Sequence, residues 1–355
     1  MNRAWRVALV VGVLLLGSGA AAVWIGIRSL DEPLPLAAPM RFKVNPGVSF
    51  GRVAAELAAQ KVIVHPRAWV LFARWSHLAS AVKAGEYEIQ PGTTPRELLT
   101  KMVNGQVLLH SFTIVDGWRV QDLLAALRRN PDIVPTLAEP APSSAGSKAA
   151  SPPNLMEKLG APDIDPEGQF LPETYRFISG TTDLEVLRQA HAALTRELDA
   201  AWMDRDPDLP LRDSHELLIM ASIVEKESGL AQELRLIAGL YLHRLAIGMR
   251  LQADPTVIYG LGERYDGDIR TVDLRTDGPY NTYTRAGLPP TPIALAGAAV
   301  IRATAHPEKT DAVYFVASPK DDGSHVFSAT LEKHNAAVAS YVAHQRQKAA
   351  GVGAK

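Results

Sequence analysis

Three charged residues stand together at Glu225, Lys226 and Glu227, directly after an apolar stretch from Leu217 to Val224 that is interrupted only by Ser222. In a helix, Glu227 continues the most apolar stripe of this stretch, whereas its two charged neighbours follow less uniformly apolar positions. A carboxyl group in that setting is partly desolvated and also stands at the negative end of the helix dipole. Both effects raise its pKa, as general-acid cleavage of a glycosidic bond requires.

An exposed charge cluster at a helix end is the alternative, and the pattern alone does not exclude it. Other chemistries are less compatible with the sequence. The chain has no cysteine, which excludes disulfides, thiolate nucleophiles and cysteine zinc sites. We find no phosphate-binding glycine loop and no nucleophile elbow. His306, His325 and His334 lack metal-type spacing, so we expect no metal site. The net charge of −1, without a basic stripe, argues against nucleic acid.

The helix that must position Glu227 has its own start and stop signals. Asp213, followed three residues later by Glu216, has the pattern of a capping box. Ser228 and Gly229 then favour termination of the helix directly after Glu227. An almost continuously apolar helix of this kind should be buried on most sides.

The N-terminus predicts export of the chain. Residues 7–27 form an uncharged run of 21 residues, which as a helix spans roughly 31 Å, about the thickness of a bilayer core. Arg3 and Arg6 precede the run, which favours a cytoplasmic N-terminus at residues 1–6. A cleaved signal peptide is the alternative, because residues 17–22 are small. The run is longer than the usual signal core of roughly 7–15 residues, so we expect a retained single-pass anchor.

Downstream, the sequence predicts an α+β protein with two folded parts. A Pro-containing linker is expected at residues 28–39 and a small module of strands and helices at 40–110. In that module, Thr94, Pro95 and Glu97 form a helix-start pattern, and Asn104-Gly105 a stop. A connecting region at 111–160 carries an Ala/Pro/Ser-rich insertion at 136–153. We expect a larger mixed α+β domain at 161–344 and a flexible tail at 345–355.

Residues 220–228, Met-Ala-Ser-Ile-Val-Glu-Lys-Glu-Ser, closely resemble the signature of the endolytic murein transglycosylases, the MltG/YceG-like family. Further stretches resemble this family in the same order along almost the whole chain, which makes the resemblance specific. They are residues 167–175, 243–245, 248–260, 280–283, 287–293, 306–307, 314–317 and 334–335. One departure is His243, where an asparagine is expected.

The resemblance implies a peptidoglycan lytic transglycosylase, a lyase. Its catalytic residue would be Glu227, not Glu225, and the Glu227-Ser228 pair resembles the Glu-Ser pair of other lytic transglycosylases. Nonhydrolytic cleavage of the β-1,4 bond between N-acetylmuramic acid and N-acetylglucosamine would leave 1,6-anhydro ends. One carboxyl serves both steps, so no cofactor is expected.

The same resemblance implies a LysM-like module at 40–110 and a catalytic domain on the periplasmic side of the bacterial inner membrane. It also implies association with cell-wall synthases and termination of the elongation of nascent glycan strands.

Several other side chains are candidates for substrate binding around Glu227: Glu173, Ser228, Gln252, Asp254, Tyr280, Asn281 and Tyr283. Loop packing, or for Asp254 a helix start before Pro255, is the alternative for these residues. A hydrolytic glycosidase remains open and would usually need a second carboxylate, for which Glu173, Asp254 and Glu263 are candidates. A noncatalytic glycan-binding scaffold also remains open.

Overall fold

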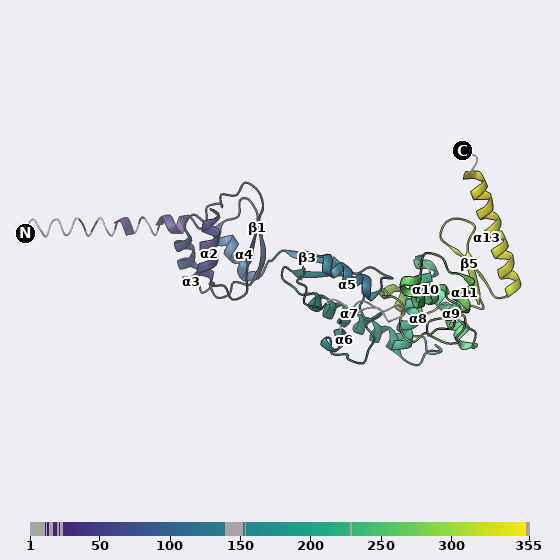
Figure 1. Cartoon of the computed structure of the whole chain (residues 1–355). Coiled ribbons are helices and arrows are strands. Elements are labelled where there is room, and N and C mark those ends of the chain that lie inside the picture. The colour runs from purple at the N-terminus through teal and green to yellow at the C-terminus, as the bar shows by residue number, and fades with distance from the viewer. Residues whose placement is uncertain are drawn as a thin grey trace, which may run out of the picture. The chain divides into compact units, whose positions relative to one another are not determined.

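The computed structural model describes residues 11, 13, 17–19, 21, 24–138, 152, 154–227 and 229–352, with the backbone alone at 349–352. The fold mixes helices and strands, as the sequence predicts (Figure 1). The chain divides into two compact units, Met1–His110 with Arg176–Thr181, and Ser111–Tyr175 with Thr182–Lys355. No helix within the described residues is both long and apolar enough to span a membrane. About half of the transmembrane helix predicted at 7–27, and most of the insertion at 136–153, lie outside the described residues.

The N-terminal unit surrounds one apolar core with an antiparallel strand pair and three helices. Phe42 and Val44 of the first strand point into this core, because alternate side chains of a strand face opposite sides. Thr94 and Glu97 form the predicted capping box, and Gly105 ends that helix in the left-handed conformation. The elements are β1 (Met40–Val44), α2 (Phe50–Ala59), α3 (Pro66–Trp75), β2 (Gly85–Ile89) and α4 (Pro95–Asn104).

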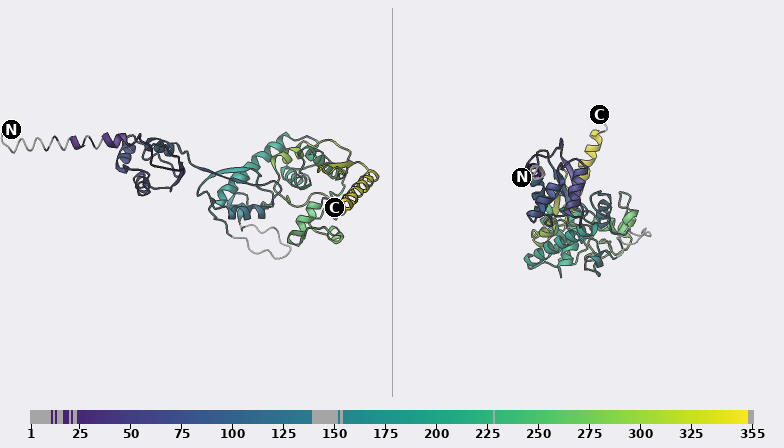
Figure 2. Two further views of the ribbon diagram at one scale, coloured as in Figure 1. Left: turned by 90° about the horizontal axis from the view of Figure 1, so that it is seen from above. Right: turned by 90° about the vertical axis from the view of Figure 1, so that its left-hand side faces the viewer.

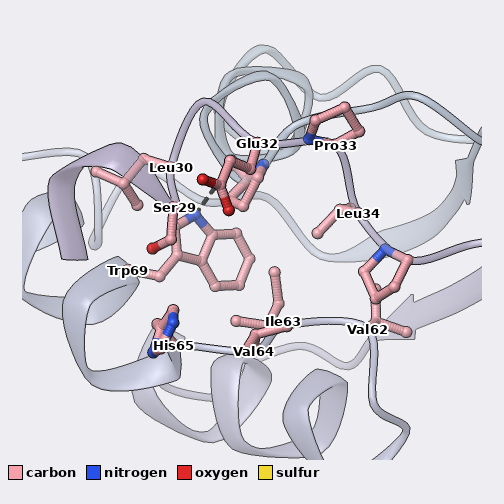
Figure 3. A pocket seen from close by; sticks show the side chains of 12 residues that line it. Ser29, Leu30, Glu32, Pro33, Leu34, Val62, Ile63, Val64, His65 and Trp69 are labelled. Carbon is pink, nitrogen blue, oxygen red and sulfur yellow. Dashed lines mark hydrogen bonds between the residues drawn. The ribbon is translucent and has the colours of Figure 1, made fainter. Parts of the chain in front are cut away.

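The segment expected as a linker is packed onto this unit. Leu30 and Leu34 are buried in its core, at 2% and 5% exposure. The amide of Leu34 donates to Thr93 O at 2.8 Å, and Arg96 holds Asp31 in a two-pronged ion pair. The segment lies over Trp69 and borders a small pocket of about 80 Å³ (Figure 3). The prolines of this segment suggested a linker, but two of its leucines, Leu30 and Leu34, are part of the apolar core.

The C-terminal unit contains the remaining helices and the strand pair β5–β6. The strand pair β3–β4 contains two of the three points at which the chain passes between the two units. The elements are β3 (Leu109–Thr113), α5 (Val120–Arg129), α6 (Leu155–Lys158), β4 (Thr174–Ile178), α7 (Asp183–Asp204), α8 (Ser214–Glu227), η1 (Ala231–Glu233), α9 (Leu234–Ala246), α10 (Asp254–Leu261), η2 (Gly262–Arg264), α11 (Thr271–Arg275), α12 (Ala298–Ala305), β5 (Tyr314–Ala317), β6 (His325–Ser328) and α13 (Leu331–Val352).

Helix α8 lies at the centre of this unit, packed against α7, α9, α10 and α12. Every residue from Leu217 to Val224 is buried, as the apolar run predicts. The carboxylate of Asp213 caps the helix start by accepting from the amide of Glu216 at 2.9 Å. Ser222 is the one polar residue of the run, and its hydroxyl donates to the carbonyl of Ile219 at 2.7 Å and accepts from the amide of Ile293 at 3.0 Å. Its burial therefore leaves no hydroxyl group unpaired.

Two segments far apart in sequence are joined beside the end of α8. The amide of Gly117 donates to Leu295 O at 2.8 Å, and the amide of Leu295 donates to Trp118 O at 2.7 Å. This short ladder fixes the turn before α5 against the chain leading into α12.

Helix α13 packs on the antiparallel pair β5–β6 and lies at the edge of the C-terminal unit in all three views (Figures 1 and 2). It continues to Val352, whereas the sequence predicts a flexible tail from Gln345. The residues from Gln345 to Ala350 are good helix formers, which explains why the helix does not stop there.

Candidate active site

The three charges at the end of α8 face different surroundings. Glu225 accepts from the amide of Gly297 at 3.0 Å, and Lys226 donates to the carbonyl of Gly117 at 3.2 Å. A Cβ atom at Gly297 would lie 2.4 Å from Oδ1 of Asp116, so a larger residue there would require the Asp116 carboxylate to shift. Burial raises the pKa of Glu225, the Gly297 amide lowers it, and Asp116 raises it further. The Glu225 carboxylate is thus tied to a neighbouring loop.

Glu227 is the last residue of α8, and its side chain is partly buried. Its Oε1 atom accepts a hydrogen bond from the hydroxyl of Tyr241 at 2.5 Å. Burial raises the pKa of Glu227 to about 7, in the direction predicted from the sequence. The Tyr241 hydrogen bond opposes this rise, the charge of Asp254 adds to it, and the charge of Arg244 opposes it. A substantial fraction of Glu227 is therefore protonated at neutral pH.

Tyr241 is a buried, permanently protonated donor. It lies on α9 with 2% exposure, and its ring packs edge-on against Phe315 at 6.0 Å. Burial first, and then the charge and hydrogen bond of Glu227, raise its pKa far above the ordinary value. Within the described residues, Oε2 of Glu227 has no hydrogen-bond partner. Because Tyr241 occupies Oε1 as a donor, the proton of neutral Glu227 resides on Oε2.

Arg244 follows Tyr241 by three residues on α9 and brings a buried positive charge to the site. Its guanidinium donates to the carbonyls of Val313 and Leu251, each at 2.5 Å, and lies 5.4 Å from the ring centre of Tyr314. Burial lowers its pKa. Among the described residues, no carboxylate lies within ion-pair distance of it. Its charge is therefore available to stabilise the anionic form of Glu227.

Asp254 and Tyr283 are also brought to this site. Asp254 is the first residue of α10, and its carboxylate accepts from the hydroxyl of Tyr283. Asp254 begins the helix, as the structural alternative predicted, but the N-cap position belongs to Ala253, so the side chain of Asp254 is not the cap. Burial, Asp254 and Glu227 all raise the pKa of Tyr283. The phenol thus stands within the field of both carboxyl groups.

Asn281 holds the loop that carries Tyr283. Its amide nitrogen donates to the carbonyls of Asp273, Leu274 and Thr276 at 2.7–3.1 Å. Its amide oxygen accepts from the amide of Tyr283 at 2.9 Å. At 6% exposure, the side chain is committed to the protein's own backbone.

Gln252 has an exposed side chain on a strained backbone. Its φ of +50° lies in the left-handed region, which costs a non-glycine residue on the order of 1 kcal/mol or more. Hydrogen bonds to the backbone and side chain of Thr282 fix this turn, at 3.2 Å from the Gln252 amide and 3.0 Å from the Ala253 amide. Strain of this kind, two residues before Asp254, is typical of a functional loop.

Other sequence candidates lie elsewhere. The hydroxyl of Tyr280 pairs with Thr291 at 2.8 Å, and its ring packs against Tyr259. Glu173 is exposed just before β4, and Glu263 is exposed in the turn η2 after α10. Ser228 lies outside the described residues.

Two residues that interact with Glu227 were not among the candidates from the sequence. Tyr241 and Arg244 stand three residues apart in the largely apolar helix α9, so they share one helix face. This spacing was the available signal. His243 lies between them, and its Nδ1 atom donates to the carbonyl of Thr310 at 2.8 Å instead of facing Glu227.

Glu167 is a second acid with a raised pKa that was not among the candidates from the sequence. It is 1% exposed and accepts from the amide of Val120 at 3.1 Å and from the hydroxyl of Tyr259 at 3.2 Å. Burial raises its pKa to about 7. By binding the first amide of α5, this carboxyl caps that helix from a distant part of the chain. Within the described ranges, no group of three or more metal-ligating side chains is assembled.

The chain is similar in sequence to known proteins of one family. A sequence model of the YceG-like family matches residues 42–340. A Bacillus subtilis protein named endolytic murein transglycosylase is 29% identical over 338 residues, covering 90% of each chain. A Streptococcus pneumoniae protein of the same name is 25% identical, and the match covers 96% of this chain but 65% of the relative. A crystal structure of a YceG-like protein from Listeria monocytogenes is 26% identical, with a TM-score of 0.46, over 84% of this chain and 98% of that one.

Proposed function

The chain belongs to the YceG-like family, and we propose that it is an endolytic murein transglycosylase in which Glu227 is the catalytic acid and base. The observation that carries this proposal is the state of Glu227. One carboxyl, with a pKa of about 7, is held on one oxygen by a buried phenol and faces a buried arginine charge. A group that titrates near neutrality can both donate and accept a proton within one turnover.

In the first step, Glu227 protonates the leaving oxygen. Its Oε2 proton passes to the glycosidic oxygen as the bond to C1 of the muramoyl residue breaks, and the N-acetylglucosamine residue leaves with a free hydroxyl. Tyr241 keeps Oε1 occupied, which directs the proton to the other oxygen. The negative charge of Asp254 favours the oxocarbenium-like centre that develops.

In the second step, the same carboxyl acts as a base. The C6 hydroxyl of the muramoyl residue attacks C1, and Glu227 takes the hydroxyl proton. The product is a 1,6-anhydro end, and Glu227 returns to its protonated form. The Tyr241 hydroxyl and the Arg244 charge stabilise the carboxylate between the two steps. The cycle consumes no water and needs no cofactor.

Gln252 and Tyr283 are proposed to contact the glycan near this carboxyl. Gln252 has an exposed side chain on a fixed turn, and Tyr283 is tied to Asp254 beside Glu227. The proposal extends to Ser228, Asp254, Tyr280 and Glu173 as further glycan contacts along the strand. Asn281 acts through Tyr283, whose amide it holds.

The test compares Glu227→Gln with Glu225→Gln, the same chemical change two residues earlier on α8. Purified peptidoglycan is digested with each protein, and its fragments are identified by mass spectrometry. Loss of 1,6-anhydro ends is expected for Glu227→Gln alone, with unchanged circular dichroism. A glutamine at 225 keeps an acceptor for the amide of Gly297 and should cleave normally. Anhydro ends at the wild-type rate from Glu227→Gln would refute the assignment.

A hydrolytic glycosidase is the second candidate, favoured by a single observation, the carboxylate of Asp254 in the field of Glu227. Such an enzyme would add water to C1 and release reducing ends. The same digests therefore distinguish the two reactions by product mass. A noncatalytic scaffold would leave the glycan intact.

We also propose that residues 7–27 anchor the protein in the bacterial inner membrane, with residues 1–6 in the cytoplasm and both units in the periplasm. The length of this uncharged run and the arginines before it support the orientation. The module at 40–110 is proposed as a LysM-like glycan contact. Cell-wall synthases are the proposed partners, because an anchored cut reaches nascent strands and ends their elongation.

A further inference from the structure

One face of α3 in the N-terminal unit is exposed, and apolar and positively charged side chains alternate along it. Leu71 and Trp75 are 68% and 79% exposed, whereas Trp69, on the opposite face, is fully buried. Exposed large side chains of this size are unusual when they are gathered on one helix face. We call this surface the docking face, formed by Arg67, Leu71, Arg74 and Trp75, at helical spacing.

The docking face has unbalanced positive charge. Helix α3 contains two arginines and no acidic residue. Neither Arg67 nor Arg74 forms an ion pair with any residue in the described part of the chain. The same two side chains border a groove of about 560 Å³ between α2 and α3, whose wall includes Ala54, Ala55 and Val70. An occupant with a negative head and an apolar body matches this surface.

The docking face is fixed beside the end of the uncharged run at 7–27. Residues 24–28 are helical, and Gly26 lies so close to α3 that an added Cβ would be 3.0 Å from Cβ of Ala68. Leu30 is buried in the core of the unit, and its carbonyl accepts from the amide of Arg96. These contacts hold residues 24–30 in a fixed position on the N-terminal unit. Wherever the run enters a bilayer, α3 must lie at the surface of that bilayer.

The apolar surface continues from this connection onto α3. Trp24, Ile25 and Ile27 are 60%, 48% and 56% exposed. Tryptophan and arginine are the side chains that favour the boundary between lipid tails and water, where an indole or a long basic side chain can span both phases.

We propose that the docking face rests on the membrane and binds the headgroups of anionic phospholipids, so that the N-terminal unit lies against the bilayer. The proposal rests on the membrane anchor proposed above. Each arginine near an anionic surface adds about 1 kcal/mol. Loss of both should reduce the ratio of docked to undocked protein about 30-fold, which corresponds to about 2 kcal/mol.

The experiment uses the full chain in lipid nanodiscs. Because the protein has no cysteine, Leu71→Cys places a single nitroxide label on the docking face. Glu88→Cys places a reference label on an exposed position of β2. The collision rate of each nitroxide is measured with oxygen, which concentrates in lipid, and with a nickel chelate, which stays in water. A label in the lipid phase collides mainly with oxygen, and a label in water mainly with the chelate. Nanodiscs of phosphatidylcholine with phosphatidylglycerol are compared with nanodiscs of phosphatidylcholine alone.

We expect the label at 71 to enter the lipid phase in anionic nanodiscs, and the label at 88 to remain in water. The double variant Arg67→Gln, Arg74→Gln should lower the ratio of docked to undocked protein, measured with the label at 71, about 30-fold. Arg41→Gln with Lys43→Gln, a charge-matched pair of exposed residues on β1, should leave it docked.

A label at 71 that stays in water in anionic nanodiscs would overturn the proposal and leave a protein partner as the occupant of this face. Equal release by both glutamine pairs would also overturn it. The same samples are assayed for nanodisc incorporation and for anhydro ends. A chain that fails to incorporate refutes the anchor and the docking together. An incorporated, active chain with its label in water refutes the docking alone.

Discussion

Replacing Tyr241 with phenylalanine should raise the pH at which the enzyme loses activity. The Tyr241 hydroxyl donates to Oε1 of Glu227 at 2.5 Å and favours the carboxylate over the acid. Burial acts in the opposite direction, and the balance places the pKa of Glu227 at about 7. The position is 2% exposed, so a phenylalanine ring fills the space and water does not replace the lost donor. The substitution removes the hydrogen bond that lowers the pKa of Glu227 and leaves the burial that raises it, so this pKa rises.

A hydrogen bond to a charged group contributes about 1.5–3 kcal/mol. At about 1.36 kcal/mol for each pKa unit, its loss moves the pKa of Glu227 from about 7 to between about 8 and 9. Because the first step needs the protonated acid, kcat/KM falls above this pKa in the free enzyme. The upper limb of the pH profile should move by the same amount.

The assay measures the rate of anhydro-end formation from purified glycan strands between pH 5 and pH 10. Tyr175→Phe is the matched control, since the buried hydroxyl of Tyr175 donates to the carbonyl of Leu171 at 2.7 Å, and its profile should follow that of the wild type. A lower plateau in the Tyr241 variant is compatible with the reasoning, because the carboxyl also loses its orientation. A midpoint that stays within about 0.3 pH units of the wild type, or moves down, would refute it.

Three further changes test other parts of the structure. Asp254→Asn removes a charge that raises the pKa of Glu227, so the upper limb of the same pH profile should move to lower pH, opposite to the tyrosine variant; an upward shift would contradict this. Glu167 has a folded pKa of about 7 against an ordinary 4.5, so its contribution to the free energy of unfolding falls as pH rises from about 4.5 to about 7. Glu227 contributes a fall over the same range, so in urea unfolding at pH 5 and pH 8 the fall for Glu167→Gln should be smaller than that of the wild type by at most about 3 kcal/mol, and an equal fall in both proteins would contradict this cause. Gly239→Ala adds a good helix former, yet the new Cβ would lie 2.0 Å from the carbonyl oxygen of Glu308. We expect about 1–3 kcal/mol of destabilisation and a lower melting temperature, whereas an unchanged or higher melting temperature would show that the backbone at Glu308 moves to accommodate the methyl group.

The sequence was most informative where the determining interactions are local. Helix α8 follows from its apolar run and from the cap at Asp213, and burial raises the pKa of Glu227 at its end, as expected. The alternating burial along β1 and the capping box of α4 are equally local patterns. Each depends on residues within a few positions of one another.

The partners of Glu227 could not be read in this way. Tyr241 and Arg244 reach it only because α9 packs against α8, and their own sequence signal was a polar pair in an apolar helix. For Asn281, the sequence indicated a polar side chain in a loop, but the three carbonyls that its amide binds are defined by the folded turn. Glu167 is paired with an amide 47 residues away. Such interactions depend on tertiary contacts that composition and periodicity do not encode.

The long-range contacts around α8 also govern the order of events during biosynthesis. A chain emerges from the ribosome with its N-terminus first, so Glu227 is made before the segment that completes the setting of α8. Ile293 binds the hydroxyl of Ser222, and Leu295 binds the turn at Gly117, only after some 70 further residues have been added. A nascent chain that ends before Ile293 carries the acid without the packing that holds its helix. The packing around the end of α8 is therefore completed only after the segment that contains Ile293 and Leu295 has been made.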